Sequence, residues 1–80
     1  MYYTYILENP EGKLYIGQTD NVGSRLLRHN SNMVKSTKNK GPWKLIYSRE
    51  FAARSESVAF ETYLKSLKSS KYIKSYIVGS

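Results

Sequence analysis

The fold of this chain is decided by residues 2–18, which read YYTYILENPEGKLYIGQ. Two runs within them, residues 2–8 and residues 13–18, are rich in Tyr, Thr, Ile and Leu, the residue types that favour β-strands. The sequence Asn-Pro-Glu-Gly separates the runs, and its Pro10 and Glu11 suit the centre of a type I turn. The stretch therefore predicts a β-hairpin.

The loop of this hairpin determines which residues face each other. Gly12 can adopt the left-handed conformation that follows a type I turn in a three-residue loop. Such a loop places Leu7 opposite Tyr15, and Tyr5 opposite Gly17. Tyr5 and Tyr15 then become diagonal neighbours on one face of the sheet.

A helix and a loop are expected next. Asp20 or Asn21 can cap a helix over residues 22–29, and residues 30–32 are expected to stop it. Residues 31–42 are polar, basic and without periodicity, which predicts a surface loop. The apolar arc of the helix consists of Val22, Leu26 and Leu27.

One more strand and two more helices complete the predicted α+β domain, which spans residues 1–80. The strand covers residues 43–51, with one of its faces meeting helices. Its two alternating sets are Trp43, Leu45 and Tyr47 against Lys44, Ile46 and Ser48. Ser55 is expected to cap a helix that continues to about residue 67. The buried stripe of that helix consists of Phe60, Leu64 and Leu67, with Glu61 at its border. A last helix, to about residue 78, is expected to turn Tyr72, Ile73, Tyr76 and Ile77 inward and Lys71 and Lys74 outward.

Composition restricts the function classes. The net charge is +7, and the whole excess comes from residue 35 onward, so the basic surface is local. Such a surface favours a phosphate backbone, although a merely solvated face is the simpler interpretation. The absence of cysteine, with His29 as the only histidine, leaves oxygen ligands for any metal ion. With no apolar run long enough for a membrane span and no signal peptide evident, we expect a cytoplasmic protein.

Three places in the sequence carry groups suited to phosphodiester hydrolysis. Tyr5 and Tyr15 lie on adjoining strands, Arg25 and His29 share one flank of the first helix beside the core, and Glu61 lies on a later helix. Hydrolysis requires that a water lose a proton, that cations meet the charge on phosphate and that the leaving oxygen be stabilised. The tyrosines could instead pack in the sheet, and Glu61 could pair with Lys65.

The same residues resemble a known family, the GIY-YIG nucleases, and in particular their short, single-domain branch. The steps of ten residues from Tyr5 to Tyr15 and from Tyr15 to Arg25 match the spacing of that family. The matching segments are YTYIL (3–7), YIGQT (15–19), RLLRHN (25–30), PWKLIY (42–47) and ETYLK (61–65).

The resemblance implies a small three-stranded antiparallel sheet flanked by helices, in the order β-β-α-β-α-α, and a metal-dependent endonuclease. Tyr15 would be the base or help to activate water, with Tyr5 orienting beside it. Arg25 would hold the scissile phosphate, and His29 would hydrogen-bond to the water or a tyrosine or itself serve as base. Glu61 would ligate one magnesium or manganese ion. The family cuts DNA to leave 5′-phosphate and 3′-hydroxyl ends.

This chain departs from the family pattern at several positions. Tyr3 and Thr4 replace the first motif's glycine and isoleucine, Gln18 stands where some members carry lysine, and Phe60 stands where the short branch often has arginine. We could not place the asparagine that longer members carry near the end of the domain.

The expected partner is DNA, with RNA left open, in DNA repair or recombination, and we assume a monomer. Backbone contacts are assigned to Arg28, Lys35, Lys38, Lys40, Lys65 and Lys68. Two alternatives remain: a nucleic-acid-binding module of the same fold without useful catalysis, or a protein-interaction domain that uses Tyr63 or Tyr72.

Overall fold

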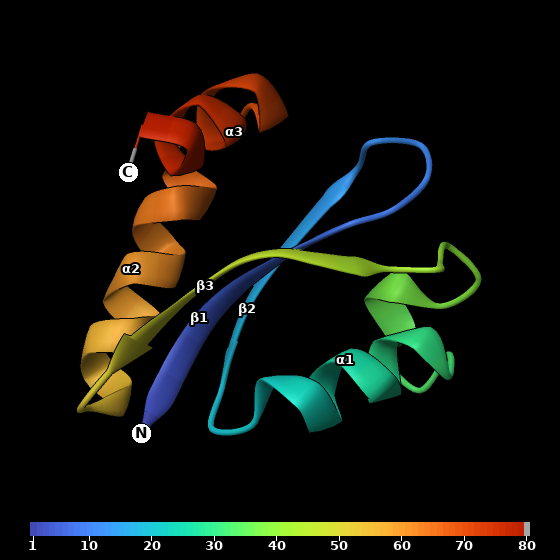
Figure 1. Ribbon diagram of the computed structural model, residues 1–80, viewed down its shortest axis with the longest axis horizontal. Coiled ribbons are helices and arrows are strands. Elements are labelled where there is room, and N and C mark those ends of the chain that lie inside the picture. The colour runs from blue at the N-terminus through green and yellow to red at the C-terminus, as the bar shows by residue number, and fades with distance from the viewer. Residues whose placement is uncertain (80) are drawn as a thin grey trace.

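The computed structural model describes residues 1–79, apart from the side chains of residues 36 and 79. Ser80, the last residue of the predicted domain, lies outside the described residues. The predicted order β-β-α-β-α-α is confirmed (Figure 1), with one additional short 3₁₀ turn. The elements are β1 (Tyr2–Glu8), β2 (Leu14–Thr19), α1 (Val22–Asn30), the 3₁₀ turn η1 (Lys35–Thr37), β3 (Lys44–Phe51), α2 (Arg54–Ser66) and α3 (Ser70–Gly79).

The β1–β2 hairpin has the predicted register. Gly12 has a φ of 82°, in the left-handed region that the loop requires. Leu7 pairs with Tyr15, and Tyr5 pairs with Gly17, as the loop chemistry predicted. The Asn9 side chain adds a contact that the prediction lacked, because its Oδ1 accepts the backbone N–H groups of Glu11 and Lys13 at 3.1 and 2.8 Å.

The sheet has the order β2-β1-β3, and all neighbouring strands are antiparallel. The predicted alternation along β3 is wrong at one point. A bulge lies between the pairs Ile6–Tyr47 and Leu7–Leu45, so Ile46 has no partner of its own on β1. Tyr47 therefore lies on the opposite face from Leu45, whereas strict alternation would place both on the same face.

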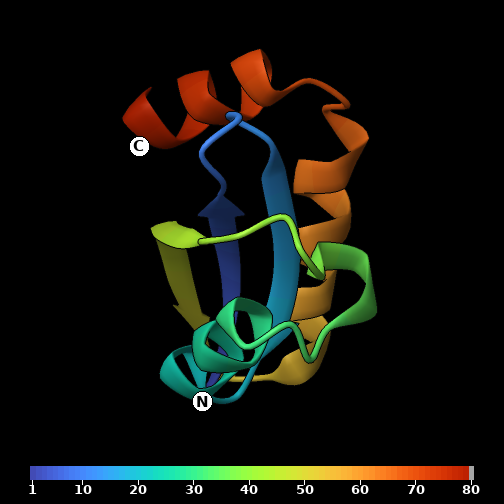
Figure 2. The ribbon, with the colours of Figure 1, turned by 90° about the vertical axis from the view of Figure 1, so that its right-hand side faces the viewer.

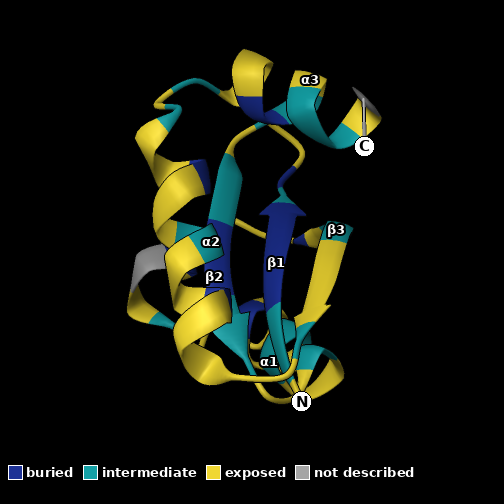
Figure 3. Cartoon of the chain, turned by 90° about the vertical axis from the view of Figure 1, so that its left-hand side faces the viewer, coloured by how far each residue is buried: buried dark blue, intermediate teal, exposed yellow. Residues whose placement is uncertain are grey.

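Helices cover both faces of the sheet rather than one. Figure 2 shows α1 in front of the sheet, and Figure 3, from the other side, shows α2 in front of it and α3 across its end. Each face has its own apolar cluster, and the two clusters meet through β1, whose central residues are the most deeply buried (Figure 3). On the α2 side the buried members are Ile6, Ile16, Leu64 and Ile73. On the α1 side they are Tyr5, Leu7 and Trp43.

Two predicted helix details need correction in α1 and α2. Asn21 caps α1, since its Oδ1 accepts the Ser24 N–H at 3.0 Å, but Leu27 is 68% exposed and does not belong to the apolar arc. In α2 the cap is Ala53, not Ser55. The Glu56 carboxylate accepts the Ala53 N–H at 3.2 Å, which lets the helix begin at Arg54 without a capping side chain at the first position.

The outward and inward faces of α3 also differ from the prediction. Tyr72 is 64% exposed, not buried, while Ile73 is buried in the α2-side cluster. Lys74 is partly exposed and forms an ion pair with Glu8 at the end of β1. This pair and the apolar contacts of Ile73 hold α3 across the hairpin end of the sheet.

The segment after α1 is not a simple surface loop, because Thr37 within it is fully buried. Asn30 binds the end of this segment: its Oδ1 accepts the Trp43 N–H at 2.6 Å, and its Nδ2 donates to the Trp43 carbonyl at 3.1 Å.

None of the helices within residues 1–79 has the length and apolar character needed to cross a bilayer.

The importance of the α2-side cluster can be tested with a matched pair of leucines. Leu64 is fully buried, so Leu64→Ala should lower the free energy of unfolding by about 2–5 kcal/mol through lost burial and the cavity left behind. Leu27→Ala removes the same atoms from an exposed position and should change it by less than about 0.5 kcal/mol. Urea denaturation measures both, and equal effects would contradict the described core.

Candidate active site

Tyr5 occupies the centre of the α1 side of the sheet. Its side chain is 1% exposed and lies across Gly17, its partner on β2. A Cβ atom at position 17 would stand 2.6 Å from the Tyr5 hydroxyl oxygen and 3.1 Å from the Tyr15 ring. Only glycine leaves room for both rings, so packing, and not backbone conformation, requires the second motif's glycine.

Tyr15 lies beside Tyr5, as the hairpin register predicted. The two ring centroids are 6.3 Å apart, and the Tyr15 ring is 4.6 Å from the ring of His29. Tyr15 is half-buried while Tyr5 and His29 are fully buried. Tyr15 is therefore the member of this trio that solvent can reach.

His29 lies inside the core and not beside it, which corrects the predicted position. Its Nε2 is 3.0 Å from the Tyr5 hydroxyl, and its Nδ1 is 2.8 Å from Thr37 Oγ1. Burial, reinforced by the charges of Arg25 and Arg28, lowers the pKa of His29 below its ordinary value of 6.5. The ring is consequently neutral at pH 7. In the folded chain its Nε2 is in contact with the Tyr5 hydroxyl.

Arg25 and Glu61 both act on the Tyr5 hydroxyl. Burial raises the pKa of Tyr5, a hydrogen-bonding interaction and the charge of Arg25 lower it, and the charges of Tyr15 and Glu61 raise it. The Arg25 guanidinium comes from α1 and the Glu61 carboxylate from α2, so groups on both sides of the sheet bear on the pKa of this one hydroxyl.

The geometry of α2 explains how Glu61 reaches this place from the other side of the sheet. Its neighbour Phe60 packs towards β3, with ring centroids 5.6 Å from Phe51 and 6.4 Å from Tyr47. Successive helix residues diverge by about 100°, so Glu61 leaves α2 on another flank than Phe60, and its ion-pair partner Lys65 shares a surface hollow with Tyr15 of β2, the edge strand. In Figure 2 both α2 and the segment that follows α1 flank this edge.

The donor set at Glu61 can be compared with the needs of a metal ion. Among residues 1–79 no group of three or more His, Cys, Asp or Glu side chains is placed to hold a metal. The half-buried Glu61 carboxylate, paired with Lys65 at 2.8 Å, is a hard oxygen donor. One carboxylate fits a magnesium-type ion that keeps several waters and takes substrate phosphate oxygens, and does not fit a closed structural site.

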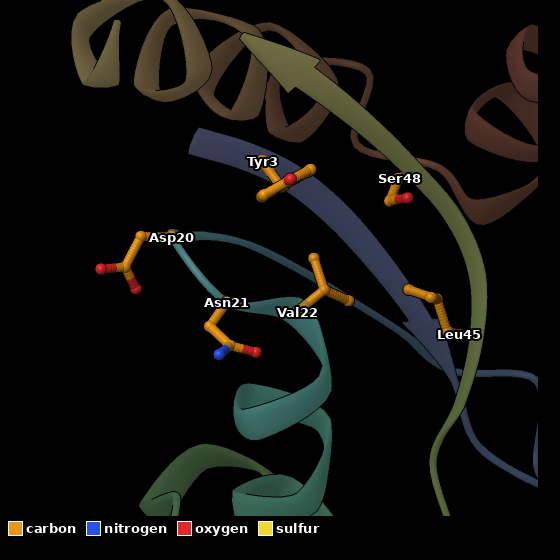
Figure 4. Close-up of a pocket in the computed structure, with 6 residues that line it drawn as sticks. All are labelled: Tyr3, Asp20, Asn21, Val22, Leu45 and Ser48. Carbon is orange, nitrogen blue, oxygen red and sulfur yellow. The ribbon is translucent and has the colours of Figure 1, made fainter. Parts of the chain in front are cut away.

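The surface pockets of the chain do not by themselves locate the predicted catalytic residues. One of about 470 Å³ lies between the sheet and the start of α1 (Figure 4), away from the predicted catalytic residues. Its lining is Tyr3, Asp20, Asn21, Val22, Leu45 and Ser48. A smaller hollow of about 280 Å³ includes Tyr15 and Lys65, the ion-pair partner of Glu61, and so adjoins the candidate site.

Comparison with known proteins decides the family. Residues 1–74 match the model of the GIY-YIG catalytic domain. This chain belongs to the GIY-YIG family. It is 42% identical over 67 residues to a UPF0213 protein of Streptococcus pneumoniae, covering 82% of this chain and 68% of that protein, and 38% identical over 68 residues to one of Clostridium perfringens, covering 84% and 73%.

A solved structure agrees with the described fold. The solution NMR structure of a UPF0213 protein from Bacillus halodurans matches with a TM-score of 0.58 and 32% identity, covering 99% of this chain and 84% of that one. The family is of nuclease type, and a nuclease-type domain implies a nucleic acid substrate in general. The names of these relatives specify no activity.

The departures from the GIY-YIG pattern have structural counterparts. Thr4 is buried and donates its hydroxyl to the Ser57 carbonyl at 2.7 Å, which ties β1 to the first turns of α2. Phe60 receives a cation–π contact from Arg49, whose guanidinium lies 5.1 Å from its ring centre. Phe60 therefore serves packing towards β3, on the flank away from the site.

Two polar atoms at or near the site have no hydrogen-bond partner within the described residues. These are the buried Nε of Arg25 and the buried Oε1 of Gln18. Buried polar groups normally have partners, and a bound water, ion or ligand is one of the ways in which an exception is completed. The Arg25 Nε–H is thus a donor available to an oxygen that the protein does not supply.

The predicted backbone-contacting cations lie in two groups. Arg28, Lys35, Lys38 and Lys40 are exposed on the end of α1 and the segment that follows it. Lys65 and Lys68 lie at the end of α2, where Lys65 is already paired with Glu61. Thr37 and Asn30 were not predicted to support the site, because neither residue has a spacing pattern that indicates its contact with His29 or Trp43.

The requirement for glycine at position 17 predicts a specific effect. Gly17→Ala should destabilise the fold by about 1–3 kcal/mol and shift the His29 ring resonances, because the new Cβ forces the Tyr5 hydroxyl away. Gly23→Ala is the control. Position 23 lies within α1, and a Cβ atom there would have its nearest neighbour at 3.7 Å. That variant should be neutral or up to about 1 kcal/mol more stable. Similar losses in both variants would contradict the described packing.

The lowered pKa of His29 makes stability depend on pH. Unfolded His29 binds a proton near pH 6.5 whereas folded His29 resists it, so the free energy of unfolding should fall as pH falls below 6.5. Titration between about pH 5.5 and 7 isolates this group, because carboxylates titrate lower. His29→Gln should flatten the dependence in this window; a wild-type stability that rises towards pH 5.5 would exclude a neutral buried ring.

Proposed function

We propose that this chain is a divalent-metal-dependent endonuclease domain that hydrolyses phosphodiester bonds in DNA. The observation that carries the proposal is the environment of the Tyr5 hydroxyl. His29 bonds to it, Tyr15 lies beside it, and Arg25 and Glu61 both act on its pKa. Five side chains from four elements thus contribute to the environment of one hydroxyl group, and membership of the GIY-YIG family supports a nuclease role for them.

Exposure suggests how the tyrosines and the histidine share their tasks. Tyr15 is the accessible hydroxyl, so it is the group that orients the attacking water and helps it lose a proton. Tyr5 and His29 are buried and support it from behind. His29 then acts through Tyr5, not by touching the water.

Arg25 and Glu61 meet the charge of the phosphate. The guanidinium offers its unpartnered Nε–H, and its fork suits two phosphate oxygens at once. Glu61 would hold the magnesium or manganese ion, which when bound supplies Lewis-acid stabilisation of the phosphoryl and leaving oxygens. In the free chain Lys65 neutralises Glu61, so Lys65 would release the carboxylate when phosphate and metal arrive.

The bond changes follow from this arrangement. A water oxygen forms a bond to phosphorus as its proton leaves towards the Tyr15 side. The bond between phosphorus and O3′ breaks, and O3′ takes a proton from solvent. The products are a 5′-phosphate and a 3′-hydroxyl end, and no oxidant or further co-reactant is needed.

A comparison that preserves side-chain shape tests the proposal. Wild-type protein with magnesium or manganese should cleave branched, flapped or nicked DNA, the structures met in DNA repair and recombination. Glu61→Gln should reduce the rate by about 100-fold or more, because it removes the metal-binding charge at almost constant shape. Glu11→Gln, in the exposed hairpin loop, should leave the rate unchanged. Undiminished cleavage by Glu61→Gln would exclude the metal role of this residue.

Binding without turnover is the alternative that the exposed cations favour. Arg28, Lys35, Lys38 and Lys40 would give DNA affinity whose logarithm falls with the logarithm of salt concentration, with a slope of about −3 or steeper. Salt-sensitive affinity combined with no cleavage of any of the three DNA structures would identify a binding module. Affinity that is nearly independent of salt would exclude both functions on this surface.

A further inference from the structure

Thr37 is a buried residue of the site that the five-residue constellation does not include. It is 1% exposed, and its Oγ1 lies 2.8 Å from His29 Nδ1. Two backbone bonds hold it in place: its N–H donates to the Val34 carbonyl at 3.1 Å, and its carbonyl accepts the Trp43 indole N–H at 3.2 Å. These bonds fix the backbone of Thr37, and the burial of its side chain keeps the hydroxyl beside the His29 ring.

The Tyr5 end of this chain of hydrogen bonds favours one direction for its protons. Arg25, which lowers the pKa of Tyr5, carries only hydrogen-bond donors and so cannot accept the Tyr5 proton. The buried Tyr5 O–H needs an acceptor, and within the described residues His29 Nε2 is the one that the structure provides. Nε2 must then carry the lone pair, and the ring proton of neutral His29 must be on Nδ1.

The Thr37 end stabilises the same direction, because its hydroxyl oxygen gives a protonated Nδ1 an acceptor inside the core. A protonated Nδ1 donates to Thr37 Oγ1, and the hydroxyl proton of Thr37 points to the Val34 carbonyl, 3.4 Å away. Every donor in the series then has an acceptor: Tyr5 to His29, His29 to Thr37, and Thr37 to Val34. The opposite tautomer would leave the Tyr5 proton competing with the Arg25 donors.

We propose that Thr37 is a positioning residue, which holds His29 in its Nδ1-protonated tautomer and thereby keeps the Tyr5 oxygen free to accept from Arg25. The catalytic consequence of this role rests on the proposed function, because the orientation of Arg25 affects the reaction only if Arg25 holds a phosphate. Its structural content, the tautomer and its cause, does not depend on catalysis.

Nitrogen-15 NMR of His29 tests the structural content directly. Because His29 is the only histidine, its ring nitrogens can be assigned without ambiguity. The wild-type protein at pH 7 should show Nδ1 with the resonance of a protonated nitrogen and Nε2 with that of an unprotonated one. Protonation of Nε2 instead, or of both nitrogens, would overturn the proposal without any variant.

Isosteric variants test whether Thr37 is the cause. Thr37→Val keeps the shape and removes the acceptor, so the Nδ1-protonated tautomer should be lost or reduced to a mixture, while Thr37→Ser should retain it. Thr62→Val, which removes an exposed hydroxyl bonded to the Val58 carbonyl on α2, should leave the tautomer unchanged. The Trp43 indole resonance reports folding, because its acceptor is the backbone carbonyl of residue 37. A folded Thr37→Val protein with the wild-type tautomer would refute the proposal.

Cleavage kinetics separate this proposal from the proposed function. Thr37→Val should lower kcat roughly 10- to 100-fold with little change in KM, as expected for a group that orients a functional residue at one remove, and Thr37→Ser should recover most of the loss. A tautomer lost without any change in kcat would overturn the catalytic consequence. Wild-type protein that shows the predicted tautomer but cleaves no DNA would instead refute the nuclease function and leave the structural role of Thr37 supported.

Discussion

The hydrogen bond between the Tyr5 hydroxyl and His29 Nε2 is the interaction on which the rest of the site depends. Both residues are almost fully buried, so each polar group must find its partner inside the protein. Gly17 is needed for the Tyr5 ring to extend across β2 to His29. The bond also fixes the last turn of α1, and with it Arg25 one turn earlier, so breaking it would disturb packing and chemistry together.

A sheet with helices on both faces still gathers its functional groups at one edge. Tyr5, Tyr15, Arg25 and His29 come from the α1 side, while Glu61 comes from the helix on the other side. β2 is the edge strand of the sheet, and α2 packs against it as well as against β1. A phosphate at this edge could meet a guanidinium, a hydroxyl and a carboxylate while the duplex itself stays outside.

The sequence predicted those features that local chemistry determines. The hairpin register followed from the loop that ends at Gly12, and it placed Tyr5 beside Tyr15. The β3 bulge, the α2 cap at Ala53 and the exposure of Tyr72 were missed, because each depends on how elements pack and not on periodicity. Thr37 was missed for the same reason. The five site residues were found from the spacing of a family resemblance, and their roles remain proposals.

The central proposal is that these five side chains form one metal and phosphate site. Mn²⁺ added with a phosphorothioate DNA that resists cleavage would test it most directly, since a paramagnetic ion broadens the NMR signals of nearby nuclei. As Mn²⁺ is added, the signals of Glu61 and of the Tyr5 and Tyr15 rings should broaden before those of other residues. The broadening should be strong only when DNA is present. Broadening centred on Asp20 or Glu50, or none at any DNA concentration, would contradict the proposed site.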